Sequence, residues 1–179
     1  MARVRGYATL PHVSKLRFVQ QQGFADAAAS SCGVQYSGLM FQPRLVAVLL
    51  AIGIATQWAP LFFALALVLA WSALVPRLSP FDALYHVSIA GPRGLPAIGP
   101  APPPRRFAQG MAASFALAIA VSLMRGATML AWVLEGFLAA AVLALVVGRF
   151  CLGSYVYHVV TGNRAYAQKT SPWARSAED

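Results

Sequence analysis

The sequence predicts an all-α, polytopic membrane protein with about four transmembrane helices and several short interfacial helices. Of its 179 residues, 59% are apolar and only 11% are charged, whereas typical globular domains carry roughly a quarter charged residues. A soluble domain of this length could not cover its surface with so few charges. The apolar residues also form four separate runs flanked by positive charge, as expected for helices that cross a bilayer.

The first two apolar runs are short and close together. Leu45 to Trp58 follows Pro43, which fits a first helical position, and Pro60 opens the second run, Leu61 to Val75. Each run of about 15 residues would be roughly 22 Å long as a helix, against a hydrocarbon core of roughly 30 Å. Three alternatives follow: flanking residues extend the two helices, the bilayer thins locally around them, or they form a tight hairpin that does not fully cross.

A short interfacial helix is predicted after the second run. Ser79 can cap it, Pro80 fits its first position, and Asp82 complements the helix dipole. A connector with six prolines follows at 92–104 and is expected to be extended and semi-rigid. The interfacial helix and the connector together occupy residues 77–106.

The third and fourth apolar runs, Phe107 to Met124 and Ala127 to Val147, are long enough to span. The third carries Ala112, Ala116 and Ala120, and such a stripe of small residues lets another helix approach closely in lipid. An alanine-rich helix that simply contacts lipid would show the same pattern.

The helical pattern continues beyond the fourth run to His158, and Gly162 stops it. The chain then divides into a cytoplasmic amphipathic arm at 1–43, a four-helix membrane domain at 44–161 and a cytoplasmic tail at 162–179.

The distribution of positive charge predicts the orientation. Arg125 alone lies on one side of the bilayer. The other thirteen lysines and arginines lie on the opposite side: Arg3, Arg5, Lys15, Arg17, Arg44, Arg77, Arg93, Arg105, Arg106, Arg149, Arg164, Lys169 and Arg175. Since positive charge favours the cytoplasmic side, we expect a multi-pass protein of a bacterial inner membrane with both termini in the cytoplasm.

Basic residues of the N-terminal arm are candidates for contact with lipid headgroups or a partner, namely Arg3, Arg5, Lys15 and Arg17. The net charge of +9 does not indicate nucleic-acid binding, because the positive charges flank apolar runs instead of clustering with aromatic residues.

Glu135 is the only acidic residue within an apolar run. It lies about nine residues past Gly126, roughly 13 Å into the helix. An ionisable residue at that depth is a candidate for a proton relay or for contact with another subunit. The alternative is a structural acid, protonated or hydrogen-bonded within the bundle.

Cys151, Ser154, Tyr155 and His158 follow a spacing that places them on one face of a helix near the cytoplasmic edge of the membrane. This stripe is a candidate redox, metal or ligand site. One thiol and one imidazole fall short of the four ligands of a structural zinc site, and the favoured interpretation is an interfacial face with Tyr and His at headgroup level.

No other pattern predicts chemistry. His12 and His86 are possible ligands for a metal or a chlorin, but they lack companions, and Cys32 is far from Cys151 in sequence. No phosphate loop, nucleophile motif, dinucleotide fingerprint or zinc-protease motif is present. We therefore expect no catalytic activity, no metal and no cofactor of its own, although lipids, quinones or pigments could contact the apolar faces.

Several short segments resemble a family of small bacterial integral membrane proteins with four predicted helices and unknown function. They are Phe41-Gln42-Pro43-Arg44, Ser79-Pro80, Arg106-Phe107-Ala108 and Phe150-Cys151-Leu152-Gly153-Ser154-Tyr155-Val156-Tyr157. The resemblance covers roughly Tyr36 to His158. It implies that the last motif usually contains Cys-x-x-Cys, whose second position is Ser154 here, so thiol chemistry within this motif is not expected.

These observations favour a non-catalytic accessory subunit of a larger respiratory or photosynthetic membrane complex, which packs by its helices and its N-terminal arm. A small oligomeric transporter or channel that uses Glu135 is one alternative. A membrane thiol-redox protein that uses Cys151 is another, although a cytoplasmic position disfavours a stable disulfide.

Overall fold

The computed structural model describes residues 10–24 and 32–171, and for 10–14 and 32–35 it describes the backbone only. The described residues form helices and no strands, which confirms the all-α prediction. The α-helices are α1 Leu10–Gln21, α2 Cys32–Thr56, α3 Ala59–Leu74, α4 Pro80–Tyr85, α5 Pro103–Met124, α6 Thr128–Val146, α7 Leu152–Val160 and α8 Arg164–Lys169. A π-helical turn, His86–Ala90, and two short 3₁₀ turns, Pro76–Leu78 and Gly91–Arg93, flank or extend α4.

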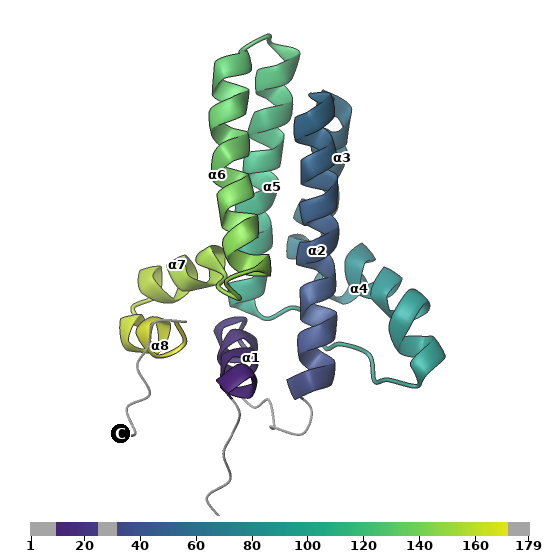
Figure 1. Ribbon diagram of the computed structural model, residues 1–179, viewed down its shortest axis with the longest axis vertical. Coiled ribbons are helices and arrows are strands. Elements are labelled where there is room, and N and C mark those ends of the chain that lie inside the picture. The colour runs from purple at the N-terminus through teal and green to yellow at the C-terminus, as the bar shows by residue number, and fades with distance from the viewer. Residues whose placement is uncertain (1–9, 25–31, 172–179) are drawn as a thin grey trace, which may run out of the picture.

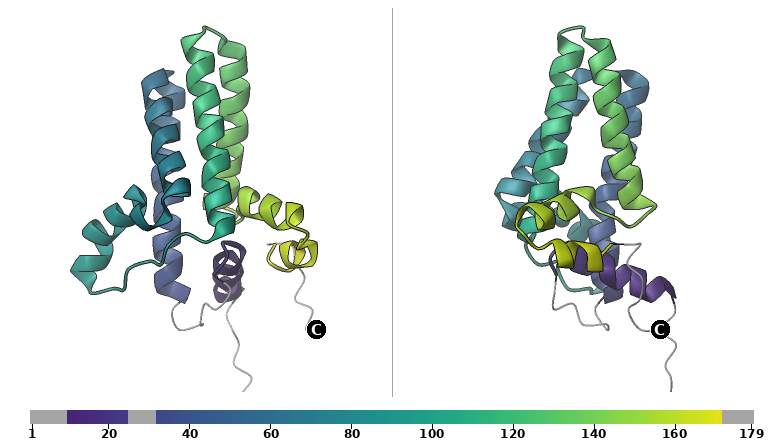
Figure 2. Two further views of the ribbon diagram at one scale, coloured as in Figure 1. Left: turned by 180° about the vertical axis from the view of Figure 1, so that it is seen from behind. Right: turned by 90° about the vertical axis from the view of Figure 1, so that its left-hand side faces the viewer.

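Two helical hairpins stand side by side and make the long part of the molecule (Figure 1). One consists of α2 and α3 and the other of α5 and α6, and their turns lie at the same end. The short helices α1, α4, α7 and α8 gather at the opposite end (Figures 1 and 2). Arg125 lies in the turn between α5 and α6, away from those short helices.

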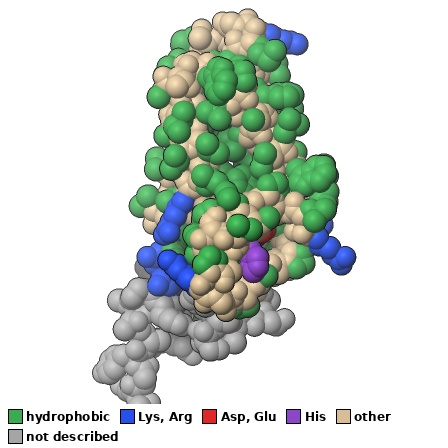
Figure 3. Space-filling view, turned by 90° about the vertical axis from the view of Figure 1, so that its right-hand side faces the viewer, with side chains coloured by type: hydrophobic (Ala, Val, Ile, Leu, Met, Phe, Trp, Pro, Cys, Tyr) green, Lys and Arg blue, Asp and Glu red, His purple; other side chains and the backbone are tan. Residues whose placement is uncertain are grey.

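Three of the described helices are long and apolar enough to cross a membrane: Tyr36–Thr56 within α2, α5 and α6. The fourth, α3, has only 16 residues, or about 24 Å, as the short second run predicted. Hydrophobic side chains cover much of the long wall of the bundle, and Lys and Arg side chains lie toward its two ends (Figure 3). This distribution is the one a bilayer requires.

The first spanning helix extends into residues that flank its apolar run, which is one of the alternatives that the short run leaves open. Pro43 lies inside α2, so its expected place in the first helical turn is wrong, and α2 crosses the predicted boundary between 43 and 44. The reason is tertiary packing: Tyr36 of α2 is buried and its ring contacts that of Phe18 in α1, with 5.7 Å between centroids. Neighbouring contacts can compensate for the hydrogen bond that a proline removes within a membrane helix.

The predicted continuation of α6 to His158 is also wrong. α6 ends at Val146, and α7 begins separately at Leu152 and runs in a different direction (Figure 1). Arg149, between them, has a φ of 53°, a left-handed conformation that no α-helix contains. The chain therefore turns between the two helices, and Cys151 becomes the N-cap residue of α7.

The alanine stripe of α5 is packed inside the chain. Ala116 and Ala120 are fully buried in the main core, and Ala112 packs at its edge. Small side chains do allow close helix packing here, but the neighbours are helices of this chain. The expected lipid or partner contact therefore does not apply to Ala116 and Ala120.

The cap of α4 agrees with the sequence. The Ser79 hydroxyl accepts a hydrogen bond from the Asp82 backbone N–H (3.4 Å), and proline occupies the first turn. Phe81 and Tyr85 are buried. This places the Asp82 side chain beside the start of α5.

Candidate functional site

A buried polar cluster lies where α2, α4 and α5 meet. Arg105, in the first turn of α5, donates from Nη2 to the Asp82 carboxylate and to Oε1 of Gln42, each at 2.9 Å. Gln109, one turn further along α5, donates from Nε2 to the same oxygen of Gln42 at 2.9 Å. Arg105, Gln42 and Gln109 are each less than 8% exposed, so the cluster is sequestered within the protein.

The arginine determines how the two amides are oriented. A guanidinium has donors only, so Gln42 must present its oxygen to Arg105. Gln109 must then present its NH₂ group to that oxygen, and its own oxygen points elsewhere. As a result, Oε1 of Gln109 is buried with no hydrogen-bond partner among the described residues, and Nη1 of Arg105 is a second such atom. Such atoms are uncommon in folded proteins and need an explanation.

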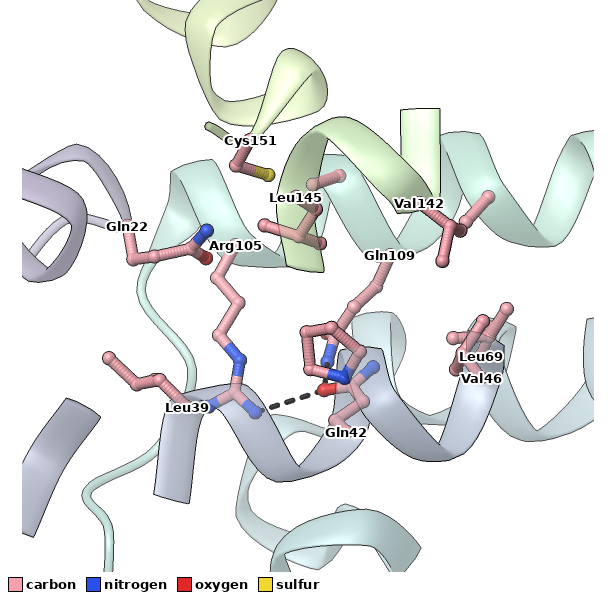
Figure 4. Close-up of a pocket in the computed structure, with 13 residues that line it drawn as sticks. Gln22, Leu39, Gln42, Val46, Leu69, Arg105, Gln109, Val142, Leu145 and Cys151 are labelled. Atoms are coloured by element: carbon pink, nitrogen blue, oxygen red, sulfur yellow. Dashed lines mark hydrogen bonds between the residues drawn. The ribbon is translucent and has the colours of Figure 1, made fainter. Parts of the chain in front are cut away.

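A cavity of about 80 Å³ adjoins this cluster. Figure 4 shows Arg105, Gln109 and Gln42 on its wall, with the Gln22 amide and the Cys151 thiol directed toward the same region. A second cavity of about 180 Å³ lies between α5, α6 and the start of α7. The two cavities share five lining residues: Ala108, Ala112, Val142, Leu145 and Cys151.

The polar stripe predicted around Cys151 is only partly assembled. Cys151, Ser154 and His158 are buried, whereas Tyr155 is only partly buried and stacks against Phe150, with 5.5 Å between ring centroids. The Ser154 hydroxyl lies 3.3 Å from the Cys151 sulfur and 3.4 Å from the carbonyl oxygen of Pro104. The stripe thus faces protein, not headgroups, at three of its four positions.

The end of α1 holds this stripe in place. Oε1 of Gln21 accepts a hydrogen bond from the Cys151 backbone N–H (3.0 Å), and the Gln21 carbonyl lies 3.2 Å from Nε2 of His158. Tyr166 of α8 donates to the Gln20 carbonyl (3.0 Å), and burial raises the pKa of its hydroxyl. The described part of the N-terminal arm is therefore bound to α7 and α8 of its own chain.

Among the basic residues proposed for lipid or partner contact, Arg3 and Arg5 lie outside the described residues. Lys15 lies over the Tyr36 ring, 5.5 Å from its centroid, as does Arg149 at 5.8 Å. Arg17 is partly buried. Lys15 thus makes a cation–π contact within the chain.

Glu135 is 1% exposed and faces the end of α2. Its two carboxyl oxygens accept hydrogen bonds from Nε2 of Gln57 at 3.1 and 3.0 Å. Gln57 has a φ of 48° and also donates to the carbonyl of Ile54. The acid therefore ties α6 to the residue that follows α2, which favours the structural interpretation.

The remaining candidate ligands do not form a metal site among the described side chains. Residues 15–24 and 36–171, whose side chains are described, contain no group of three metal-ligating side chains. His86 is exposed, and the side chains of His12 and Cys32 lie outside the described ones.

The sequence patterns identify neither the buried polar cluster of Gln42, Arg105 and Gln109 nor the separate contact of the partly buried Gln57 with Glu135. One signal was present: Arg105 and Gln109 are four residues apart, so they share a face at the entry to an apolar helix.

Comparison with known proteins gives one match. A family model described as "Domain of unknown function (DUF4395)" matches residues 34–161, which run from the first turn of α2 through α7 and include every residue that lines the two cavities except Gln22. No curated protein and no solved structure matches the chain. Since the match spans well over half of the sequence, the chain belongs to the DUF4395 family.

Proposed function

We propose that this protein is a non-catalytic subunit of a larger assembly in a bacterial inner membrane, of respiratory or photosynthetic type, and that α6 is the helix that packs against the partner. The observation that carries the proposal is a row of small residues on the outward side of α6. Gly136 and Ala140 are exposed, and Ala144 is partly exposed. A Cβ atom added at Gly136 would meet nothing within 4 Å.

Small residues four apart suit helix association in lipid. Hydrophobic burial contributes little there, because lipid tails are as apolar as leucine, and association depends on close packing. The opposite side of α6 already packs in the core through Leu138 and Val142. The row therefore lies on the side of α6 that remains available to another chain.

The chemistry of the polar groups supports a non-catalytic role. Cys151 and Ser154 are buried and contact each other, and Glu135 is held by Gln57. A nucleophile is activated by a neighbouring base, whereas the Ser154 hydroxyl donates to the Cys151 sulfur and lies near the Pro104 carbonyl. These contacts favour structural roles.

The proposed orientation has both termini in the cytoplasm. Of the eleven lysines and arginines in residues 10–24 and 32–171, ten flank the spans on the side of α1, α7 and α8, and Arg125 lies in the opposite turn. This imbalance supports a cytoplasmic position for the end that carries the short helices.

The test compares Ala140→Leu with Ala64→Leu in affinity-tagged protein extracted from native membranes in mild detergent. Ala64 is exposed on α3, so it provides the same substitution on another helix. We expect the wild type and Ala64→Leu to retain a partner in constant stoichiometry. Ala140→Leu adds volume at the contact, which typically costs about 1–3 kcal/mol and corresponds to an affinity for the partner that is roughly 5- to 150-fold lower.

Both variants are expected to keep the thermal stability of the isolated chain, because leucine at a lipid-facing position is tolerated. Equal retention of the partner by Ala140→Leu and the wild type would contradict the proposal for α6. A wild-type chain that carries no other protein would contradict the subunit function itself.

A further inference from the structure

We propose that the two adjoining cavities bind one neutral amphiphile, whose hydroxyl-bearing head occupies the cavity beside Arg105 and Gln109 and whose alkyl tail lies between α5 and α6. The site is distinct from the proposed partner contact, and neither proposal depends on the other. Three observations carry the inference: two unpaired buried polar atoms, the charge balance around them, and the confinement of amide and guanidinium side chains to the wall of the smaller cavity.

The unpaired atoms define the head group. Nη1 of Arg105 is a donor, and Oε1 of Gln109 is an acceptor. Both residues line the cavity and are 4% exposed. A hydroxyl group can accept from the first and donate to the second, whereas a purely apolar group could satisfy neither.

The charge around the cavity favours a neutral head. The positive charge of Arg105 already faces the Asp82 carboxylate at 2.9 Å. The other polar residues on the cavity wall are Gln22, Gln42 and Gln109, which are uncharged, and Cys151 is the remaining titratable group there. An anionic head would introduce a second negative charge beside a guanidinium that is already compensated.

The shape of the site favours an amphiphile over water alone. A volume of about 80 Å³ corresponds to two or three water molecules, at roughly 30 Å³ each in the liquid. The adjoining cavity of about 180 Å³ is lined by apolar side chains such as Met111 and Phe115, and apolar cavities do not hold water well. Phe137 and Leu152 on its wall are also exposed on the outer surface, so a tail can enter from the bilayer.

Cys151 provides a direct probe because it is buried and lines both cavities. The chain has two cysteines, so Cys32→Ser leaves Cys151 as the only thiol. The experiment follows the rate at which N-ethylmaleimide alkylates Cys151 in the purified full-length chain, by intact mass. Two amphiphiles with small hydroxyl-bearing heads are added separately: decylhydroquinone, kept reduced under argon, and monodecanoylglycerol. Decane, which has no head group, is the control.

We expect at least one amphiphile to slow alkylation by about tenfold when its concentration is ten times its dissociation constant, because only the ligand-free fraction reacts. Decane is expected to have no such effect. Protection by the quinol alone would identify the ligand class as quinol, and protection by the glyceride alone would identify it as lipid. If neither amphiphile protects, or if decane protects equally, the inference is overturned.

Two variants test the polar contact and the space separately. Gln109→Met removes the acceptor at similar volume and is expected to abolish protection, whereas Gln168→Met, at an exposed position of α8, should retain it. Ala112→Leu leaves the polar atoms intact but fills the wall shared by both cavities, and it should also abolish protection. If Gln109→Met fails to fold, Ala112→Leu decides: full protection in that variant overturns the inference.

Discussion

Replacing one member of the ion pair between Arg105 and Asp82 should destabilise the protein more than a substitution at an exposed position. The pair joins α5 to α4 at 2.9 Å, and its side chains are 5% and 17% exposed. Removing one partner of a buried pair typically costs about 3–5 kcal/mol. Because Asp82 retains some contact with solvent, we expect the lower end, about 3 kcal/mol, for Asp82→Ala. Loss of the carboxylate from the first turn of α4 adds up to about 1 kcal/mol.

The assay is thermal unfolding in mild detergent at a fixed heating rate. In a chain of this length, 1 kcal/mol shifts the midpoint by roughly 2–4 °C, so a total cost of about 3–4 kcal/mol for Asp82→Ala should lower it by about 6–16 °C. Arg77→Gln, at an exposed position, is the control and should leave the midpoint almost unchanged.

A double-mutant cycle separates the pair from its surroundings. Arg105→Met together with Asp82→Ala removes both charges, so no buried charge is left without a partner. The double variant should therefore be more stable than the sum of the single effects implies, by about 2 kcal/mol. Strictly additive effects would refute the claim that these two residues stabilise each other.

Three further predictions concern other contacts. Gln57→Leu removes the hydrogen-bond donor to Glu135 and should lower the free energy of unfolding by about 1–3 kcal/mol, measured by thermal unfolding. Combining it with Glu135→Leu should recover most of that loss. If stability is not recovered, the hydrogen bond between Gln57 and Glu135 is not the cause. Gly153→Ala places a Cβ atom 2.7 Å from the Cα of Ala108, so α7 must shift. The midpoint of thermal unfolding should fall by the equivalent of about 1–3 kcal/mol. An unchanged midpoint would contradict the close contact between α7 and α5. Burial raises the pKa of Tyr166 above its ordinary 10.0, so the folded protein favours the neutral phenol. The stability that depends on the neutral phenol is complete below pH 10 and declines as the pH rises through the pKa of the folded state. The midpoint of wild type should fall above pH 10 more steeply than that of Tyr166→Phe, and parallel curves would contradict this.

The helices of the membrane domain could be predicted because their signals are local. A run of apolar residues is sufficient to indicate a spanning helix in α5 and α6, and Ser79 with a following proline is sufficient to indicate the start of α4. These patterns depend on residues close together in the chain.

The errors occurred where distant residues decide the structure. Local sequence favours Pro43 as the start of a helix, but α2 begins earlier, because the contact between Tyr36 and Phe18 joins two helices that are separate in the sequence. The turn at Arg149 was missed because a left-handed arginine has no sequence signature comparable to that of glycine.

The polar stripe around Cys151 could be predicted only in part, because distant residues supply some of its contacts. The spacing of Cys151, Ser154 and His158 indicated a shared face, and all three are buried together. Their partner Gln21 is 130 residues from Cys151 in the chain, so no local pattern could have identified it. The cluster of Gln42 with Arg105 likewise depends on the packing of α2 against α5.

The most direct test of the central proposal is native mass spectrometry of the tagged chain, extracted from its own membrane with the surrounding lipid. The account predicts a complex well above the 19.0 kDa of the chain, containing at least one different protein in fixed stoichiometry. A species that contains only this chain, as a monomer or as a homo-oligomer, would contradict the account.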